Sequence, residues 1–318
     1  MDIEDESINA AIVYYCYNRL DHTQKSLPKI IEYKGNLSLF IFCDGEKTEA
    51  NKQDVNEVRE YVRKSTDNVQ EYEIILRNTN FGLAPNVIDG VNMVFDKGFD
   101  SVIVLEDDCV PKQDFFTYMV KALKFYNSNP KVMHISGFGM PLKTKISKDS
   151  YMTPYPCSWG WGTWKNKWQL CDFDDNKAYQ KIISDTKLMN LFDWSGKSFS
   201  YFLSLQLKGE VNSWLIRWYV HIFNQKGVCV WATNSKLDNI GFDGTGEHKV
   251  RFDIFNQKKG NVLKEFEYEN DLTFKKPIIK EFRRYFMGPK LINKIKTIIY
   301  VKTGLIFDKV RDISNYYN

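Results

Sequence analysis

The strongest constraint on the fold is an alternation of apolar, strand-like runs with helical stretches over the first hundred residues. The first two runs are nearly continuous and rich in β-branched and aromatic side chains, which is typical of strands covered on both faces. Alternation of this kind predicts an α/β fold with a Rossmann-like, mostly parallel sheet flanked by helices. The expected strands are 8–17, 37–43, 73–77 and 101–105, and the expected helices are 21–32, 48–64 and 85–97, the first of them capped by Asp21 or Thr23.

The second half of the chain is less regular. A helix is expected at 115–127 and a strand at 131–136, and residues 137–156 are expected to be a loop-rich stretch that leads to an aromatic cluster at 158–164. No internal repeat and no linker rich in Gly, Ser or Pro marks a second core. We therefore predict one main domain over residues 1–270 and a helical C-terminal extension over 271–318.

Three features bear on where the chain works. The six cysteines lack the short paired spacings of zinc knuckles or disulfide frameworks, so buried thiols in a cytoplasmic protein are expected. Residues 1–7 are acidic and run directly into a strand, which is unlike a signal peptide. No run of about 18 uncharged apolar residues occurs, so a membrane-spanning helix is not expected.

The basic charge of the chain is concentrated in its tail. Residues 275–311 contain eleven Lys and Arg against two acids, a net charge of +9, whereas the rest of the chain sums to −5. Two interpretations stay open. The tail is an amphipathic helix on an anionic membrane surface, which would make the protein peripheral at the inner membrane face, or a helix packed on the body with its charges in water. No nucleic-acid recognition motif accompanies the charge, so nucleic acid is not an expected partner.

Polar side chains follow three of the predicted strands. Asn18 and Arg19 follow the first, Asp44 the second, and the Glu-Asp-Asp triplet at 106–108 the fourth. Ligands of open α/β sheets bind beyond the carboxyl ends of the strands. A triplet with no Lys or Arg beside it favours a divalent cation, and carboxylate oxygens suit Mg²⁺ or Mn²⁺ held together with substrate phosphates. Taken alone, the triplet is equally a solvated acidic turn.

Several segments, taken in order, resemble N-acetylglucosaminyltransferase I and related bacterial family 2-like transferases with the GT-A fold. SVIVLEDDCVPKQDFF at 101–116 is similar to the strand, DxD-like acidic motif and following helix of that family. The resemblance covers roughly residues 10–248 and leaves the tail outside it. The ordered set is more specific than any one member. The other segments are AIVYYCYNRLDHTQKSL (11–27), FCDGEK (42–47), NTNFGLAPNVIDGV (78–91), PCSWGWGTWKNKW (156–168) and NSWLIRWYVHIF (212–223).

The resemblance implies a donor-binding site around the triplet. Asp108 would ligate the metal and bridge it to the donor diphosphate, while Glu106 and Asp107 would contact the sugar and ribose. Arg19 and Asp44 would lie near the nucleobase and ribose, where a carboxylate that accepts from a uracil N–H favours uridine. An ordinary ion pair or a turn cap is the alternative for each of these two. The same pocket would be lined by Tyr17, Asn80, Gly82 and Leu83.

The aromatic cluster and a late histidine each allow two interpretations. Trp159, Trp161 and Trp164, separated by glycines, would form an acceptor-facing loop that stacks on sugar rings, or would belong to the core. His248 ends a Gly-rich run at 239–248 that resembles a closing loop in bacterial relatives. It would be a further metal or phosphate contact, or a surface side chain in a turn.

The general base departs from the family pattern. Transfer with inversion at the anomeric carbon needs a carboxylate that takes the proton of the attacking hydroxyl. The family's late helix supplies an Asp beside the Trp that corresponds to Trp214, but this chain has Asn212 and Ser213 there, and neither can act as a base. The carboxylates that could replace it are Glu210, which is nearest along the chain, Asp243 and Glu247.

Together these features predict a metal-dependent, inverting hexosyl- or N-acetylhexosaminyltransferase. It would move a sugar from a UDP-sugar to a glycan or lipid-linked acceptor in surface polysaccharide synthesis, with Mn²⁺ or Mg²⁺ as cofactor. The change at Asn212 keeps open a catalytically silent homologue that binds sugar nucleotides and acts by interaction. A nucleotidyltransferase is disfavoured because residues 17–20 do not resemble a Gly-rich, basic loop that holds a triphosphate.

Overall fold

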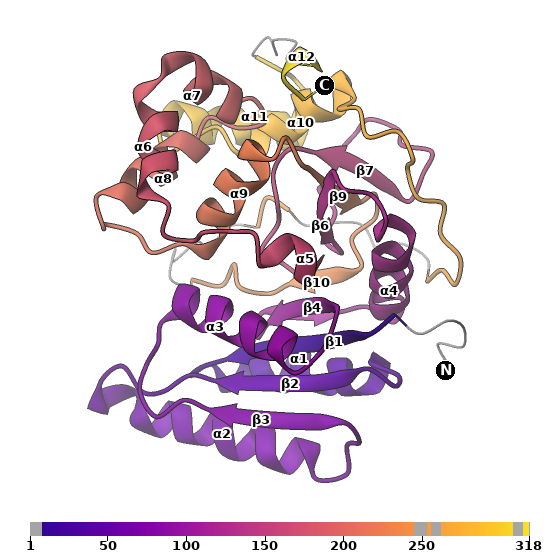
Figure 1. The fold of residues 1–318 in the computed structure, drawn as a ribbon, viewed down its shortest axis with the longest axis vertical. Helices are drawn as coiled ribbons and strands as arrows, with labels where there is room; N and C mark the ends of the chain where they lie inside the picture. Colours follow the sequence, from indigo (N-terminus) through magenta and orange to yellow (C-terminus); the bar gives the residue numbers. More distant parts are fainter. Residues whose placement is uncertain (1–7, 245–252, 256–261, 308–313, 318) are drawn as a thin grey trace.

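The protein is a mixed α/β structure built on one large sheet (Figure 1). The computed structural model describes residues 8–244, 253–255, 262–307 and 314–317. Eight strands lie in the order β3-β2-β1-β4-β8-β6-β9-β7, and all except β8 and β7 run in the same direction. The predicted α/β fold with a large, mostly parallel sheet flanked by helices is therefore confirmed.

The first half of the chain forms the parallel half of the sheet. Every residue of β1 is buried, so this strand is covered on both faces, as its continuous apolar sequence predicts. The elements of this half are β1 (Ala10–Cys16), α1 (Leu20–Tyr33), β2 (Ser38–Cys43), the 3₁₀ turn η1 (Glu49–Asn51), α2 (Lys52–Thr66), β3 (Tyr72–Leu76), α3 (Leu83–Asp96) and β4 (Ser101–Glu106).

The second half adds mixed strands and a group of helices. β8 lies antiparallel between β4 and β6, and β10 pairs with β5 in a separate two-stranded ribbon directly after the acidic triplet. The elements are β5 (Cys109–Pro111), α4 (Phe115–Tyr126), β6 (Val132–Ser136), β7 (Ser150–Thr153), β8 (Trp161–Trp164), α5 (Lys165–Trp168), α6 (Asn176–Ser184), α7 (Thr186–Phe192), α8 (Phe199–Leu207), α9 (Trp214–Asn224), β9 (Val228–Ala232) and β10 (Leu237–Asn239).

The structure adds detail at three places. The stretch at 137–156 is rich in loops as expected but contains β7, and the aromatic cluster at 158–164, for which a loop was one of two interpretations, ends in β8. A Cβ on Gly162 would lie 2.8 Å from the carbonyl oxygen of Val102, so β8 can run this close to β4 only where a side chain is absent. Helix α1 begins at Leu20, so Asp21 and Thr23 lie inside its first turn and do not cap it.

The order of the strands reverses between β1 and β4. From β1 the chain adds β2 and β3 on one side, and β4 then pairs on the other side, with Tyr15 opposite Glu106. At such a reversal the connections leave the sheet in opposite directions, and a crevice opens outside the carboxyl ends of the two strands. The segments after Cys16 and Glu106 therefore meet beside this crevice.

The C-terminal helices are α10 (Lys276–Tyr285), α11 (Leu291–Thr303) and α12 (Ser314–Tyr317). Helix α10 is part of the main core, because Ile278 and Phe282 are buried and Phe282 makes an edge contact with Trp231 of β9. The division at residue 270 stays a prediction. In the described part of the chain, none of the helices has the length and apolar character that crossing a bilayer requires.

Candidate functional site

An arginine and two aspartates meet at the crevice between β1 and β4. Arg19 stands at the start of α1, and Asp107 and Asp108 follow β4. The Nε of Arg19 donates to Asp107 Oδ2 at 3.2 Å, and its Nη2 donates to Asp107 Oδ1 and, at 3.2 Å, to Asp108 Oδ2. The cation that the sequence lacks beside the triplet is thus supplied from 88 residues away.

The two aspartates differ in exposure. The side chain of Asp107 is 5% exposed and that of Asp108 is 15% exposed. Burial raises the pKa of Asp107 to about 6, and the neighbouring Asp108 acts in the same direction while Arg19 opposes both. The two carboxylates raise the pKa of Arg19 even though burial works against this. Asp107 is therefore the buried partner of Arg19, and Asp108 is the carboxylate that is more open to a ligand.

The donor atoms at this point suit a hard divalent cation. Asp108 contributes carboxylate oxygens, and its Oδ1 accepts from a weak donor, the thiol of Cys109, with Sγ at 3.5 Å. Among residues 8–244, 253–255, 262–307 and 314–317, no three His, Cys, Asp or Glu side chains are grouped to hold a metal. In general, Mg²⁺ at nucleotide sites is held by one or two carboxylates together with substrate phosphates. His248, the other predicted ligand, lies outside the described residues.

At the end of β2, the buried carboxylate of Asp44 holds the loop that follows β3. Its Oδ1 accepts from the backbone N–H of Gly45 at 2.9 Å and of Phe81 at 2.8 Å. Its Oδ2 accepts from Gly82 N at 3.1 Å and Asn80 Nδ2 at 3.3 Å. A carboxylate has about four acceptor positions. The protein fills them all, so the predicted contact with a uracil N–H would require one of these bonds to open.

The loop after β3 presents apolar side chains beside the hydrogen bonds of Asp44. Phe81 and Leu83 are 40% and 39% exposed, and the guanidinium of Arg77 lies 4.4 Å from the centre of the Phe81 ring. Gly82 has φ +74°, which a residue with a side chain rarely adopts. The family resemblance predicts Asn80, Gly82 and Leu83 at this point, whereas Phe81 and Arg77 were not predicted. The signal available for Phe81 was its position inside the matching segment 78–91.

The ends of β1 and β2 are also joined directly. The hydroxyl of Tyr17 accepts from the backbone N–H of Lys47 at 3.2 Å. Tyr17 is half-buried. Tyr17, Arg19, Asp44 and the triplet therefore all follow carboxyl ends of neighbouring strands, as the sequence predicts.

The segment after β10 covers the triplet. The backbone N–H of Ile240 donates to the carbonyl oxygen of Asp108 at 2.9 Å. A Cβ on Gly241 would lie 2.5 Å from Asp108 Oδ2, so the approach depends on a glycine. Two residues later, Asp243 Oδ2 lies 3.3 Å from Nε2 of the buried His22 on α1. A further carboxylate thus reaches this edge of the sheet, beside a histidine that the sequence analysis did not single out.

The predicted base positions lie on the segment between α8 and α9. Glu210 and Asn212 are both exposed, and Asn212 Oδ1 accepts from Arg217 Nη2 at 2.9 Å. Trp214, which begins α9, stacks on Trp161 with ring centres 4.7 Å apart. Trp161 lies opposite Val104 of β4, so the start of α9 faces the same edge of the sheet as the triplet. The roles of Glu210 and Asn212 stay predictions.

The three tryptophans proposed for the acceptor differ in exposure. Trp161 and Trp164 are 0% and 2% exposed and pack in the core, so neither presents a ring face to solvent. Trp159 is partly exposed and contacts Phe138, Phe242 and Phe255. Of the three, Trp159 is the one that a sugar could reach without rearrangement of the core.

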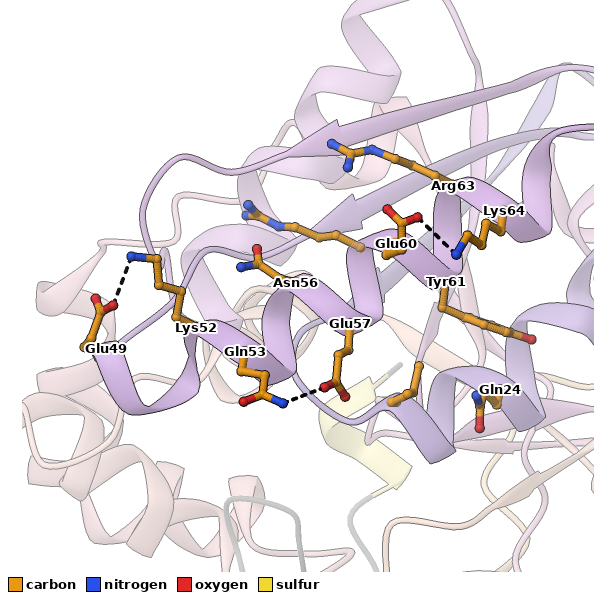
Figure 2. Close-up of a pocket in the computed structure, with 12 residues that line it drawn as sticks. Gln24, Glu49, Lys52, Gln53, Asn56, Glu57, Glu60, Tyr61, Arg63 and Lys64 are labelled. Atoms are coloured by element: carbon orange, nitrogen blue, oxygen red, sulfur yellow. Dashed lines mark hydrogen bonds and ion pairs between the residues drawn. The ribbon is translucent and has the colours of Figure 1, made fainter.

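An open groove of about 970 Å³ lies along α1 and α2 and is separate from the triplet (Figure 2). Two pairs of its charged side chains satisfy each other: Lys52 pairs with Glu49 at 3.0 Å, and Lys64 with Glu60 at 3.2 Å. These pairs are exposed, so they leave this part of the groove a solvated surface. The crevice between β1 and β4 is the better candidate site.

No protein-family model and no curated protein matches the sequence. Among solved structures, the chain is similar to one from Desulfovibrio desulfuricans G20 described as a "putative nucleotide-diphospho-sugar transferase", with 9% sequence identity and a TM-score of 0.33. The match covers 51% of this chain and 65% of that one. A likeness this distant says nothing of activity, which only the geometry of the site can support.

Proposed function

We propose that the chain is a GT-A glycosyltransferase that moves a sugar from a nucleotide diphosphate donor, a UDP-sugar in the first instance, to a hydroxyl group. The acceptor would be a glycan or a lipid-linked sugar in surface polysaccharide synthesis. The observation that supports this best is the meeting of Arg19, Asp107 and Asp108 where the strand order reverses. A guanidinium suits a phosphate and a carboxylate suits a divalent cation, so the two together suit a metal–diphosphate complex.

Each residue of the crevice has a role in this proposal. Asp108 would hold Mn²⁺ or Mg²⁺, and what such an ion supplies when bound is neutralisation of the charge on the leaving diphosphate. Arg19 would donate to oxygens of the same diphosphate from the start of α1. Asp44 fixes the loop at 80–83, whose exposed Phe81 ring offers a face for the base.

Transfer needs a group that accepts the proton of the acceptor hydroxyl. As the oxygen bonds to the anomeric carbon, the bond from that carbon to the diphosphate breaks and the proton passes to a carboxylate. The amide of Asn212 cannot accept it. Glu210 and Asp243 remain, and Asp243 is favoured because the contacts of residues 240 and 241 with Asp108 carry its segment over the triplet.

A second function is favoured by one observation, the amide of Asn212 held by Arg217 at the expected base position. A homologue without a base could bind a sugar nucleotide and act through interaction alone. Turnover separates the two functions. We expect release of UDP from a panel of UDP-sugars in the presence of Mn²⁺, and a fall of at least about tenfold in Asp243→Asn or Glu210→Gln. No turnover with any donor, alongside tight UDP binding, would favour the silent homologue.

Nucleotide binding tests the donor site itself. Calorimetry with UDP and Mn²⁺ should show metal-dependent binding that weakens at least about tenfold in Asp108→Asn, since a neutral amide is a poor ligand for a hard cation. Asp100→Asn is the matched control, because Asp100 is an exposed carboxylate just before the other end of β4. Equal metal-dependent binding by the Asp108→Asn variant and the unmodified chain would refute the proposal.

A further inference from the structure

Helix α11 presents its apolar side chains to solvent. Leu291, Ile292, Ile295 and Ile298 are 73%, 59%, 48% and 38% exposed. Leu291, Ile295 and Ile298 follow the spacing of four and then three residues that places side chains on one face of a helix. We call these four residues the apolar stripe of α11. A stripe of large aliphatic side chains in water is unfavourable unless another surface covers it.

The opposite face of α11 is polar and holds the helix to the body of the protein. Asn293, Thr297 and Tyr300 repeat the same spacing two residues out of phase with the stripe. Asn293 Nδ2 donates to Met287 O at 2.7 Å, Thr297 Oγ1 to Arg284 O at 2.8 Å, and Tyr300 OH to Glu281 Oε2 at 2.7 Å. Thr297 and Tyr300 are buried. These bonds fix the rotation of α11, so the stripe faces outward as a consequence of specific contacts.

The charge around the stripe is all of one sign. Residues 288–307 contain four lysines and no acidic residue. Lys294 and Lys296 stand on either side of Ile295 along the chain, and Lys302 continues the face of the stripe one turn beyond Ile298. Lysine stems can lie along an apolar surface while their ammonium groups stay in a polar layer. Beyond the helix, Leu305 and Phe307 are also exposed, at 58% and 48%.

We propose that α11 docks the protein onto an anionic lipid surface, with the apolar stripe in the lipid interface and the lysines at the headgroups. The combination of exposed aliphatic side chains with lysines and no acids suits lipid better than a protein partner, because lysine is depleted in protein interfaces. A helix of 13 residues lies in the plane of an interface and is too short to cross a bilayer. The proposal stands apart from the donor site, whose residues belong to other elements.

Figure 1 shows what this docking would do to the orientation of the molecule. Helix α11 lies at the end of the sheet that carries β7, whereas β3 and α2 lie at the far end. A chain bound through α11 would therefore hold β3 and α2 away from the lipid. Charge variants on α2 are accordingly suitable controls.

Flotation of the full chain with lipid vesicles tests the proposal. We expect binding to phosphatidylcholine vesicles that contain phosphatidylglycerol and little binding to pure phosphatidylcholine. The double change Ile295→Glu with Ile298→Glu should weaken binding at least about tenfold, since it places two charges in the lipid interface. Lys294→Glu should weaken it by about fivefold or more, which is the contribution of one cation near an anionic surface. Matched controls are Leu170→Glu, at an apolar residue 70% exposed before α6, and Lys64→Glu on α2.

The outcomes separate lipid from other occupants. Equal binding by the stripe variant and the unmodified chain, or no binding to anionic vesicles, overturns the proposal. A dimer in sedimentation that the stripe variant converts to monomer, without vesicle binding, would identify a second copy as the occupant and also overturns it. Urea unfolding and UDP calorimetry of each variant show whether the fold and the donor site are intact, so a failure here is distinct from a failure at Asp108.

Discussion

The two halves of the sheet differ in the kind of side chain that they bring together. At the carboxyl ends of β1, β2 and β4 stand charged side chains, Arg19, Asp44 and the 106–108 triplet, which hydrogen-bond across the crevice or to the loop beside it. In the other half, β8, β6 and α9 bring rings together: Trp161 stacks on His134 with centres 5.4 Å apart and on Trp214 at 4.7 Å. The first half thus gathers polar side chains at the carboxyl ends of its strands, and the second holds α9 against the sheet through stacked rings.

This difference indicates what a substitution in each half should change. We call β1, β2 and β4 with the charged side chains at their carboxyl ends the polar half, and β8, β6 and α9 the aromatic half. Removing a ring from the aromatic half should lower the free energy of unfolding. Removing a charge from the polar half should mainly weaken ligand binding. Asp44 is the exception in the polar half, because protein donors fill its acceptor positions. Measurements of stability therefore test whether the two halves are as distinct as they look.

The largest loss of stability is expected for Trp161→Ala. Its side chain is fully buried between His134, Trp168 and Trp214, so truncation leaves a cavity and should lower the free energy of unfolding by about 4 kcal/mol. Urea unfolding gives the value, and Trp159→Ala is the control because that ring is partly exposed. Equal losses at both positions would show that Trp159 belongs to the same core and would remove the last candidate of the three for the acceptor.

The second largest loss is expected for Asp44→Ala, which should lower the free energy of unfolding by about 3 kcal/mol. The change leaves the backbone N–H groups of Gly45, Phe81 and Gly82 without an acceptor in a partly buried loop. Asp100→Ala, an exposed aspartate just before β4, should cost about 0.5 kcal/mol or less in the same urea titration. A small effect at Asp44 would mean that its carboxylate is free for a ligand, as the sequence alone predicts.

The next largest loss of stability is expected on acidification, which should destabilise the aromatic half. Burial lowers the pKa of His134 to about 3, so the unfolded chain binds a proton at this residue near pH 6.5 and the folded chain does not. Stability then falls as the pH drops below about 6.5, by about 2 kcal/mol at pH 5 from this residue. Urea midpoints at pH 7 and pH 5 measure the loss, and His134→Gln should reduce it. The His22→Gln variant, in the polar half, should keep it. Burial also lowers the pKa of His221 to about 4, so part of the loss should remain in His134→Gln. An undiminished loss in that variant would exclude His134 as a source.

The polar half could be predicted from the sequence because its signals are local. Continuous apolar runs mark β1 and β2, and the residues that follow a parallel strand lie at its carboxyl end whatever the rest of the chain does. The pairing of Arg19 with Asp107 could not be predicted, because it depends on β1 and β4 being neighbours across 88 residues. The hydrogen bonds that occupy the Asp44 carboxylate could not be predicted either, since three of its four donors come from the loop after β3.

The aromatic half and the tail resisted prediction for a different reason. A short strand such as β8, with the sequence Trp-Gly-Thr-Trp, has no apolar period of its own, and it is a strand because β4 and β6 lie on either side of it. In α11 the spacing of apolar residues indicates a helix but not which face is outward. The outward face of α11 is determined by hydrogen bonds from Asn293, Thr297 and Tyr300 to neighbouring segments.

The smallest effect is expected for Asn212→Asp, on the segment that leads into α9. A carboxylate there would accept from Arg217 as the amide does, at 2.9 Å, so stability should change by about 0.5 kcal/mol or less. The same guanidinium would lower the pKa of the new carboxyl and hold it in place, and a carboxylate tied up in this way is a poor base. UDP release should therefore change less than about threefold, with Asn212→Ala as the control. A gain of tenfold or more would mean that the family's base position still works here and that Asn212 alone limits the transfer.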